Sequence, residues 1–126
     1  MEKGKIESFK DLLVWQKGVE IADELYLVTR KFPKEELFGL TSQIRRAAVS
    51  VPANIAEGWG RNRTKSYIQF IRISVGSLYE LETLLTIANN QNYIDQNQKS
   101  ILSDKIDDLG KMLNSLLKKL EKYSND

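Results

Sequence analysis

The chain has 126 residues, no cysteine and no histidine, and its formal net charge is +2. The lack of cysteine and histidine excludes disulfides, thiolate metal sites and the commonest general base of enzymes. No apolar run approaches the about 20 residues of a membrane helix, and the N-terminal residues lack the apolar core of a signal peptide. We therefore expect a cytoplasmic protein that forms one domain over residues 1–126 and holds no metal or other cofactor.

The positive charge is concentrated in one part of the chain. All six arginines lie between Arg30 and Arg72, where nine basic residues face three glutamates. A basic zone within a nearly neutral chain points to an anionic partner more than to a catalytic pocket.

Apolar residues at helical spacing predict a first helix from about Leu12 to Lys31, with Asp11 as its N-cap. Two apolar stripes run along it. One contains Leu12, Trp15, Val19, Ala22 and Tyr26, and the other contains Val14, Gly18, Ile21, Leu25 and Val28. One stripe is enough for a helix of a small bundle, so two stripes indicate more apolar surface than a single subunit covers.

A second helix is predicted from about Leu37 to Gly58, after the break at Phe32-Pro33. Pro52 lies inside it and removes one backbone hydrogen bond, at a cost of about 3 kcal/mol if nothing compensates. Because the apolar residues continue in phase, we expect a kinked helix, with the freed carbonyl near Ala48 bonded to water or a side-chain donor. Two abutting helices are the alternative.

Gly58 and Gly60 supply the backbone freedom to end that helix, and Thr64 is the predicted N-cap of a third helix from about Lys65 to Asn90. Gly76 inside it costs about 1 kcal/mol relative to alanine, so we expect another helix to approach it closely.

A fourth helix is predicted from about Gln96 to Tyr123, because its leucines alternate spacings of four and three as in a coiled coil. Four helices joined by short loops predict an all-α, antiparallel up-down four-helix bundle with a kinked second helix.

No residue pattern points to catalysis. Asp104, Asp107 and Asp108 share one helix face, but lysines alternate with them, so we interpret the face as a solvated charge ladder. Glu20 and Glu24 have the same interpretation. Serine and threonine lack a histidine base, so we expect no enzyme and no catalytic residue.

Three single residues have competing interpretations. Glu57 stands alone in an apolar stretch, and we expect it to form a structural ion pair with Arg61 or with an arginine of another helix. Trp59 has the helical phase of the core, so burial is favoured over stacking on a nucleobase, and Trp15 is expected in the core as well.

The candidate nucleic-acid-binding residues come from the basic zone, where they are expected to form one exposed surface. They are Arg45, Arg46, Arg61, Arg63, Lys65 and Arg72. Arginine suits bidentate contacts to phosphate, whereas the alternative is that these residues are solvated or paired with acids of the first helix. No known nucleic-acid-binding motif accompanies them, so we expect no strong sequence preference.

Several long sequence motifs indicate a family. They are FKDL with VWQK in residues 9–17, FPKEE with FGLT in residues 32–41, QIRR with SVPANIAEG in residues 43–58, and GSLYELE in residues 76–82. In these motifs the chain resembles the four-helix bundle proteins encoded by intervening sequences in bacterial 23S ribosomal RNA genes. The resemblance implies a ring of subunits, most often a homopentamer, and it does not imply an enzyme. A related branch, the accessory proteins of diversity-generating retroelements, implies RNA or DNA and a reverse transcriptase as partners.

Two functions follow as hypotheses. One is a nucleic-acid-binding ring that uses the arginines of each subunit. The other is a protein-interaction scaffold ring whose basic residues are structural. In either case we expect a homo-oligomer held by apolar surface of the first two helices, including Ala47, Ala48 and Ala53.

Overall fold

The computed structural model describes residues 5–124, which form four long helices and contain no strand. The helices are α1 (Leu13–Thr29), α2 (Leu40–Trp59), α3 (Thr64–Asn90) and α4 (Gln96–Glu121), with two short 3-10 helices, η1 (Phe9–Asp11) and η2 (Lys34–Glu36). The prediction of an all-α, four-helix fold is confirmed. No helix in the described part of the chain is long and apolar enough to cross a membrane.

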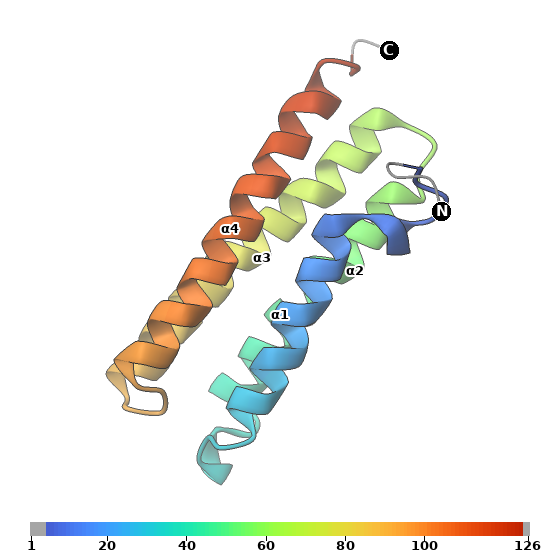
Figure 1. The fold of residues 1–126 in the computed structure, drawn as a ribbon. Helices are drawn as coiled ribbons and strands as arrows, with labels where there is room; N and C mark the ends of the chain where they lie inside the picture. Colours follow the sequence, from blue (N-terminus) through green and yellow to red (C-terminus); the bar gives the residue numbers. More distant parts are fainter. Residues whose placement is uncertain (1–4, 125–126) are drawn as a thin grey trace.

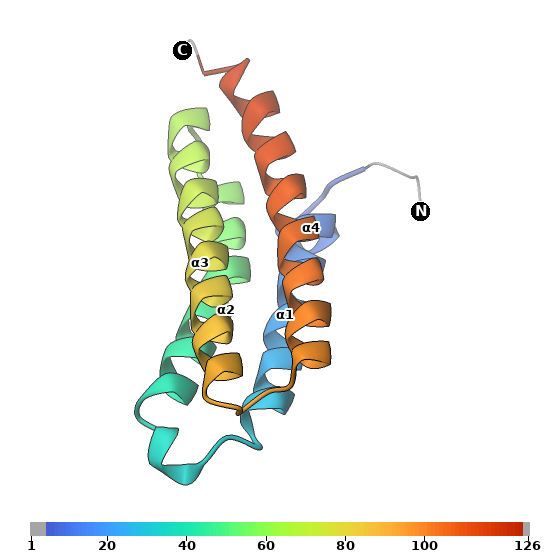
Figure 2. The ribbon, with the colours of Figure 1, turned by 90° about the vertical axis from the view of Figure 1, so that its left-hand side faces the viewer.

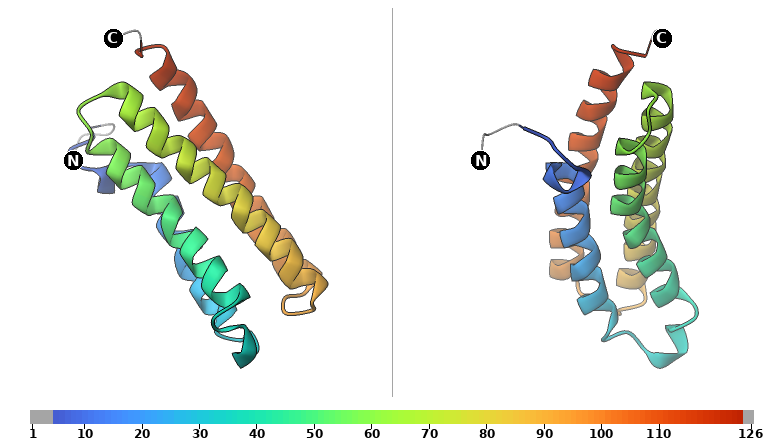
Figure 3. Two further views of the ribbon diagram at one scale, coloured as in Figure 1. Left: turned by 180° about the vertical axis from the view of Figure 1, so that it is seen from behind. Right: turned by 90° about the vertical axis from the view of Figure 1, so that its right-hand side faces the viewer.

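The helices lie side by side, and the chain reverses direction at each connection (Figure 1). It runs down α1, up α2, down α3 and up α4. Figure 2 and the right-hand view of Figure 3 show α2 and α3 as one layer and α1 and α4 as the other. Each helix packs on the next one along the chain, and α1 also packs on α4. The α2–α3 turn is at the upper end, whereas the other two connections are at the lower end.

One apolar core fills the space between the four helices. Its fully buried side chains come from every helix and include Leu25, Ile44, Ile55, Ile71, Leu81 and Leu113. Burying a leucine or isoleucine side chain stabilises a fold by about 1.5–3 kcal/mol, so the periodic positions hold the bundle together. Ala47 and Ala48 belong to this core, while Ala53 is exposed.

The start of α1 differs from the prediction. Its N-cap is Leu12, which provides no side-chain hydrogen bond. Asp11 instead completes a capping box with Ser8 around η1, where its carboxylate accepts from the backbone N–H groups of Glu7 and Ser8. The aspartate therefore caps the short helix that precedes α1.

α2 continues through Pro52 as a single helix, so the alternative of two abutting helices is wrong. The proline ring faces Gly18 of α1, where an added Cβ atom would lie 3.2 Å from the Cβ atom of Pro52. Side-chain donors reach two carbonyls beside the proline. Asn54 donates to the carbonyl of Ser50, and Ser74 of α3 donates to that of Val51, both at 2.8 Å.

Glu36 holds the lower end of the bundle together. Its Oε1 accepts from the backbone N–H of Leu40 at 3.0 Å, and its Oε2 accepts from the Tyr93 hydroxyl at 3.0 Å. Tyr93 also packs against Phe32, with 5.4 Å between the ring centres. α2 consequently begins at Leu40, three residues later than predicted, because the preceding segment forms η2 and then caps the helix.

The starts of α3 and α4 differ in their capping. Thr64 is the first residue of α3 and Arg63 its N-cap, so the prediction of Thr64 as the cap is wrong. Asp95 caps α4 with a full capping box to Gln98.

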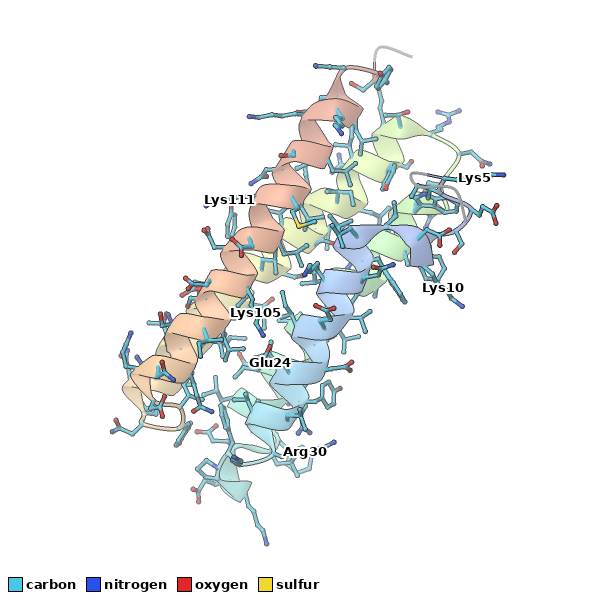
Figure 4. All side chains as sticks on the ribbon, viewed as in Figure 1. Lys5, Lys10, Glu24, Arg30, Lys105 and Lys111 are labelled. Carbon is cyan, nitrogen blue, oxygen red and sulfur yellow. The ribbon has the colours of Figure 1, made fainter. Side chains whose placement is uncertain are left out.

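α1 and α4 are joined by an ion pair, with 2.7 Å between Lys105 Nζ and Glu24 Oε2, and both side chains are labelled in Figure 4.

Candidate nucleic-acid interface

The six candidate cations do not form one patch. Arg45 and Arg46 lie in the first half of α2, near the lower end of the bundle, whereas Arg61, Arg63 and Lys65 surround the turn at the upper end (Figure 1). Sixteen residues separate Arg45 from Arg61, which corresponds to roughly 24 Å along a helix that rises 1.5 Å per residue. The prediction of a single basic surface is therefore wrong.

Arg45 is a structural residue. Its Nε donates to the Thr29 hydroxyl at 2.9 Å, and its guanidinium lies 4.6 Å from the ring centre of Tyr26. A further bond of 3.4 Å reaches the carbonyl of Tyr26, in the last turn of α1. Because Arg45 is partly buried and directed at α1, it does not join an exposed basic surface.

Arg46 is exposed beside a hollow of about 360 Å³ between α2 and α3. Glu80 of α3 lines the same hollow, so an anion at Arg46 would also meet a carboxylate. This mixed charge makes Arg46 a weaker phosphate site than the turn at the upper end.

The turn between α2 and α3 brings three of the candidates together. Arg61, Arg63 and Lys65 are all exposed within five residues. Glu57 lies one helical turn before Arg61, and the two form an exposed ion pair with 3.1 Å between Oε2 and Nη2. The Arg61 guanidinium also lies 4.7 Å from the ring centre of Phe70. These two contacts hold Arg61 in one orientation at the surface.

The first turn of α3 adds to the positive potential at this place. Its N-cap provides no side-chain hydrogen bond, and its first turn contains no acidic residue. The first N–H groups of a helix lack carbonyl partners and carry the positive end of the helix dipole. Three cations therefore lie beside an uncapped helix start, and Glu57 offsets part of the charge of Arg61. Arg63, Lys65 and the first N–H groups of α3 form an arrangement that suits a phosphate group.

Arg72 lies two turns further along α3 and is paired. Its Nη2 donates to Oε2 of Glu121 on α4 at 2.9 Å, with both side chains about half exposed. The pair links the upper parts of α3 and α4 and neutralises the charge of Arg72. Of the six candidates, the structure thus groups three, leaves Arg46 apart and ties two to neighbouring helices.

The two tryptophans differ in their relation to the core. Trp15 packs against it and meets Phe9 edge to face at 5.3 Å. Trp59 is only partly buried and is not among the residues that pack against the core, so its predicted burial is wrong.

The described residues contain no group of three metal-ligating side chains.

An exposed apolar groove was missed by the sequence analysis. It has a volume of about 640 Å³ and is lined by side chains of α1, α2 and the connection between them, including Tyr26, Leu37, Phe38, Arg45 and Val49. Phe38 is 94 % exposed. The helical pattern does not reveal this groove, because it predicts Leu37 and Phe38 as the start of the second helix, whereas α2 begins at Leu40.

Comparisons with known proteins agree with this fold. A solved structure of a protein of unknown function, from the S23 ribosomal protein family of Bacteroides thetaiotaomicron, matches with a TM-score of 0.78 and 24 % identity. The match covers 84 % of this chain and 96 % of that chain, and at this identity it shows the fold alone. No curated protein sequence matches significantly. The sequence profile of the 23S rRNA-intervening sequence protein family matches residues 10–115. The chain therefore belongs to the 23S rRNA-intervening sequence protein family.

Proposed function

We propose that the protein is a cytoplasmic, non-enzymatic, self-associating four-helix bundle that binds the phosphates of RNA or DNA at the α2–α3 turn. The observation that carries this proposal is the grouping of Arg61, Arg63 and Lys65 around an uncapped helix start. Contacts to phosphate do not read base sequence, so binding is without strong sequence preference.

Self-association would repeat the phosphate-binding α2–α3 turn in every subunit and so strengthen binding to a polynucleotide. In a homopentameric ring with the helices of each bundle antiparallel, the turn occurs once per subunit. A polynucleotide that spans several subunits then gains from the high effective concentration of each further contact. Exposed apolar side chains such as Leu13, Leu27 and Val49 provide surface for contacts between subunits.

A second candidate function is a scaffold that binds another protein, for example a reverse transcriptase. The groove beside Phe38 favours this candidate, because an almost fully exposed aromatic residue next to an apolar hollow is typical of protein contact sites. The involvement of Arg45 and Arg72 in contacts within the subunit is also consistent with basic residues that are structural.

Fluorescence anisotropy with labelled structured RNA and single-stranded DNA tests the first candidate. Binding should weaken with salt, since each neutralised phosphate contributes about −0.9 to the log–log salt slope for duplex DNA and about −0.7 for single strands. Arg61→Ala with Arg63→Ala should lower the affinity for all sequences alike. Lys118→Ala with Lys119→Ala removes the same charge from the exposed end of α4 and should have a smaller effect. Failure of the wild-type protein to bind either nucleic acid at low salt would leave the scaffold as the function.

A further inference from the structure

The apolar groove between α1 and α2 combines exposed apolar side chains with two arginines. It lies at the lower end of the bundle, beside the connection that joins the two helices (Figure 1). Phe38 stands almost wholly in solvent, and Tyr26, Leu37 and Val49 are exposed as well. Adjoining apolar side chains at a surface mark contact sites, because their burial against another molecule is favourable.

Arg45 carries a charge that has no counter-ion within residues 5–124. Its bonds go to the Thr29 hydroxyl and the Tyr26 carbonyl, which are neutral groups, and its guanidinium lies over the Tyr26 ring. None of the ion pairs in this part of the chain includes it. The carbonyl end of α1 supplies only part of a negative charge. Because a partly buried charge is normally paired, this position favours a carboxylate from outside the subunit.

The arginines give the groove a positive charge that no residue of the groove offsets. The bonds of Arg45 use two of its N–H groups and leave the others for a further acceptor. Arg46 is exposed and lines the same groove, and none of the residues that line it is acidic. Glu80 lines the separate hollow between α2 and α3. A partner that fills the groove therefore has to be both apolar and negatively charged.

We propose that the apolar groove binds an acidic, amphipathic helix of another protein. The apolar side chains of that helix pack on Leu37, Phe38 and Val49. Its aspartates or glutamates pair with Arg45 and Arg46, since the arginine fork binds a carboxylate with two parallel hydrogen bonds. The inference rests on the scaffold candidate of the proposed function and names the chemistry of its partner.

The apolar side chains decide between a peptide and a polynucleotide. A strand of RNA or DNA carries a charge at every phosphate, and it offers no aliphatic group that would pack on Leu37 and Val49. An amphipathic helix presents large apolar residues and carboxylates along one side, and such helices bind in apolar grooves through residues at spacings of three and four.

Fluorescence anisotropy with a labelled synthetic peptide tests the inference on the full-length protein. The probe is an amphipathic helix of about 14 residues, with leucines along one face and glutamates beside them. We expect a Kd in the micromolar range. A second peptide with lysine in place of each glutamate should bind at least about tenfold more weakly, because its charges have the same sign as the arginines of the groove.

Substitutions in the groove should act on this binding without unfolding the subunit. Phe38→Ala should weaken it at least about tenfold, and the fold should persist because Phe38 is 94 % exposed. Arg46→Ala should weaken it about threefold and reduce the preference for the acidic peptide. Tyr123→Ala, which removes an exposed aromatic ring after α4, is the matched control for Phe38 and should have no effect. Arg61→Ala with Arg63→Ala should also leave peptide binding unchanged.

Four results would overturn the inference. Equal affinity for the acidic and basic peptides would show that the groove selects apolar residues alone, and the scaffold candidate would stand without this choice of partner. Absence of binding at peptide concentrations up to about 1 mM would remove the groove as a peptide site. Displacement of the peptide by single-stranded DNA would show that the groove binds nucleic acid. Loss of assembly in Phe38→Ala, measured by light scattering, would show that a second copy covers the groove. Nucleic-acid binding at the α2–α3 turn is measured separately with the Arg61 and Arg63 variant, so its failure is distinct from each of these results.

Discussion

Gly58 of α2 lets Phe70 of α3 approach so closely that a Cβ atom at position 58 would lie 2.8 Å from the Cβ atom of Phe70. The same atom would lie 2.9 Å from Cδ1 of Tyr67 and 3.3 Å from its carbonyl oxygen. Gly58 is therefore a packing residue inside α2, and the turn that follows depends on this contact between the two helices.

Gly58→Ala should lower the free energy of unfolding by about 1–3 kcal/mol, because Phe70 and the backbone of Tyr67 must move to accommodate the methyl group. Urea denaturation followed by circular dichroism measures this change. Gly110→Ala meets no such obstacle and should be neutral or stabilising by up to about 1 kcal/mol. Equal stability of Gly58→Ala and the wild type would show that the helices separate at no cost.

Stability should fall in alkaline solution because of Tyr93. Its hydrogen bond to Glu36, burial and the nearby carboxylates of Glu36 and Glu35 raise its pKa above the ordinary value of 10.0. A raised pKa means that the folded protein retains the proton longer than the unfolded chain, so the stabilisation is complete below pH 10.0 and is lost as the pH rises through the folded pKa.

Tyr93→Phe should flatten the decline of the melting temperature between about pH 9 and pH 11.5. A part of the decline should remain, because burial also raises the pKa of Tyr67. Tyr79→Phe removes an exposed hydroxyl and should keep the wild-type profile. An unchanged profile in Tyr93→Phe would contradict the assignment.

Two ion pairs of similar length should differ in their effect on stability. Lys99 is only 14 % exposed and bonds to both Glu82 and Ser103, at 2.7 and 3.0 Å. Lys99→Ala leaves the partly buried Glu82 carboxylate without its cation and should cost about 1–2 kcal/mol. Arg72→Ala breaks a half-exposed pair with Glu121 and should cost less than about 1 kcal/mol. Thermal unfolding of both variants gives the comparison, which would fail if Arg72→Ala were the more damaging.

Arg45→Ala should lower stability by about 1–2 kcal/mol without weakening nucleic-acid binding, because its bonds go to Thr29 and Tyr26 of α1. Arg45→Lys should restore little, since an ammonium group cannot reproduce the planar donors that serve both partners. A loss of nucleic-acid affinity in a stable Arg45→Ala protein would show that Arg45 belongs to the nucleic-acid interface.

The sequence predicts the parts of the fold that depend on helical periodicity. Four helices, the continuous α2 and the burial of Leu102, Leu109 and Leu113 on α4 follow from apolar spacing alone. Helix starts were less predictable, because a cap depends on which backbone groups a side chain reaches. Asp11 and Thr64 have suitable side chains for an N-cap, yet Asp11 caps η1 and Thr64 lies inside α3.

The candidate site was only partly predictable for a related reason. Sequence shows that Arg61, Arg63 and Lys65 are neighbours, and a turn exposes them together. It does not show that Arg72 reaches Glu121, which is 49 residues away, or that Arg45 reaches across to α1. The close helix approach expected at Gly76 occurs at Gly58 instead, because only the three-dimensional packing decides which glycine faces a neighbour.

Glu36 gives the backbone of Leu40 an unusual property for the first residue of a helix. Such an amide has no carbonyl partner within its helix and normally exchanges its proton with solvent rapidly. Here the proton is held by a carboxylate that also binds Tyr93, which is 57 residues from Glu36 in the sequence. Hydrogen–deuterium exchange at the Leu40 amide should therefore be slow. Its rate should measure how often the α1–α2 and α3–α4 connections separate at the lower end of the bundle.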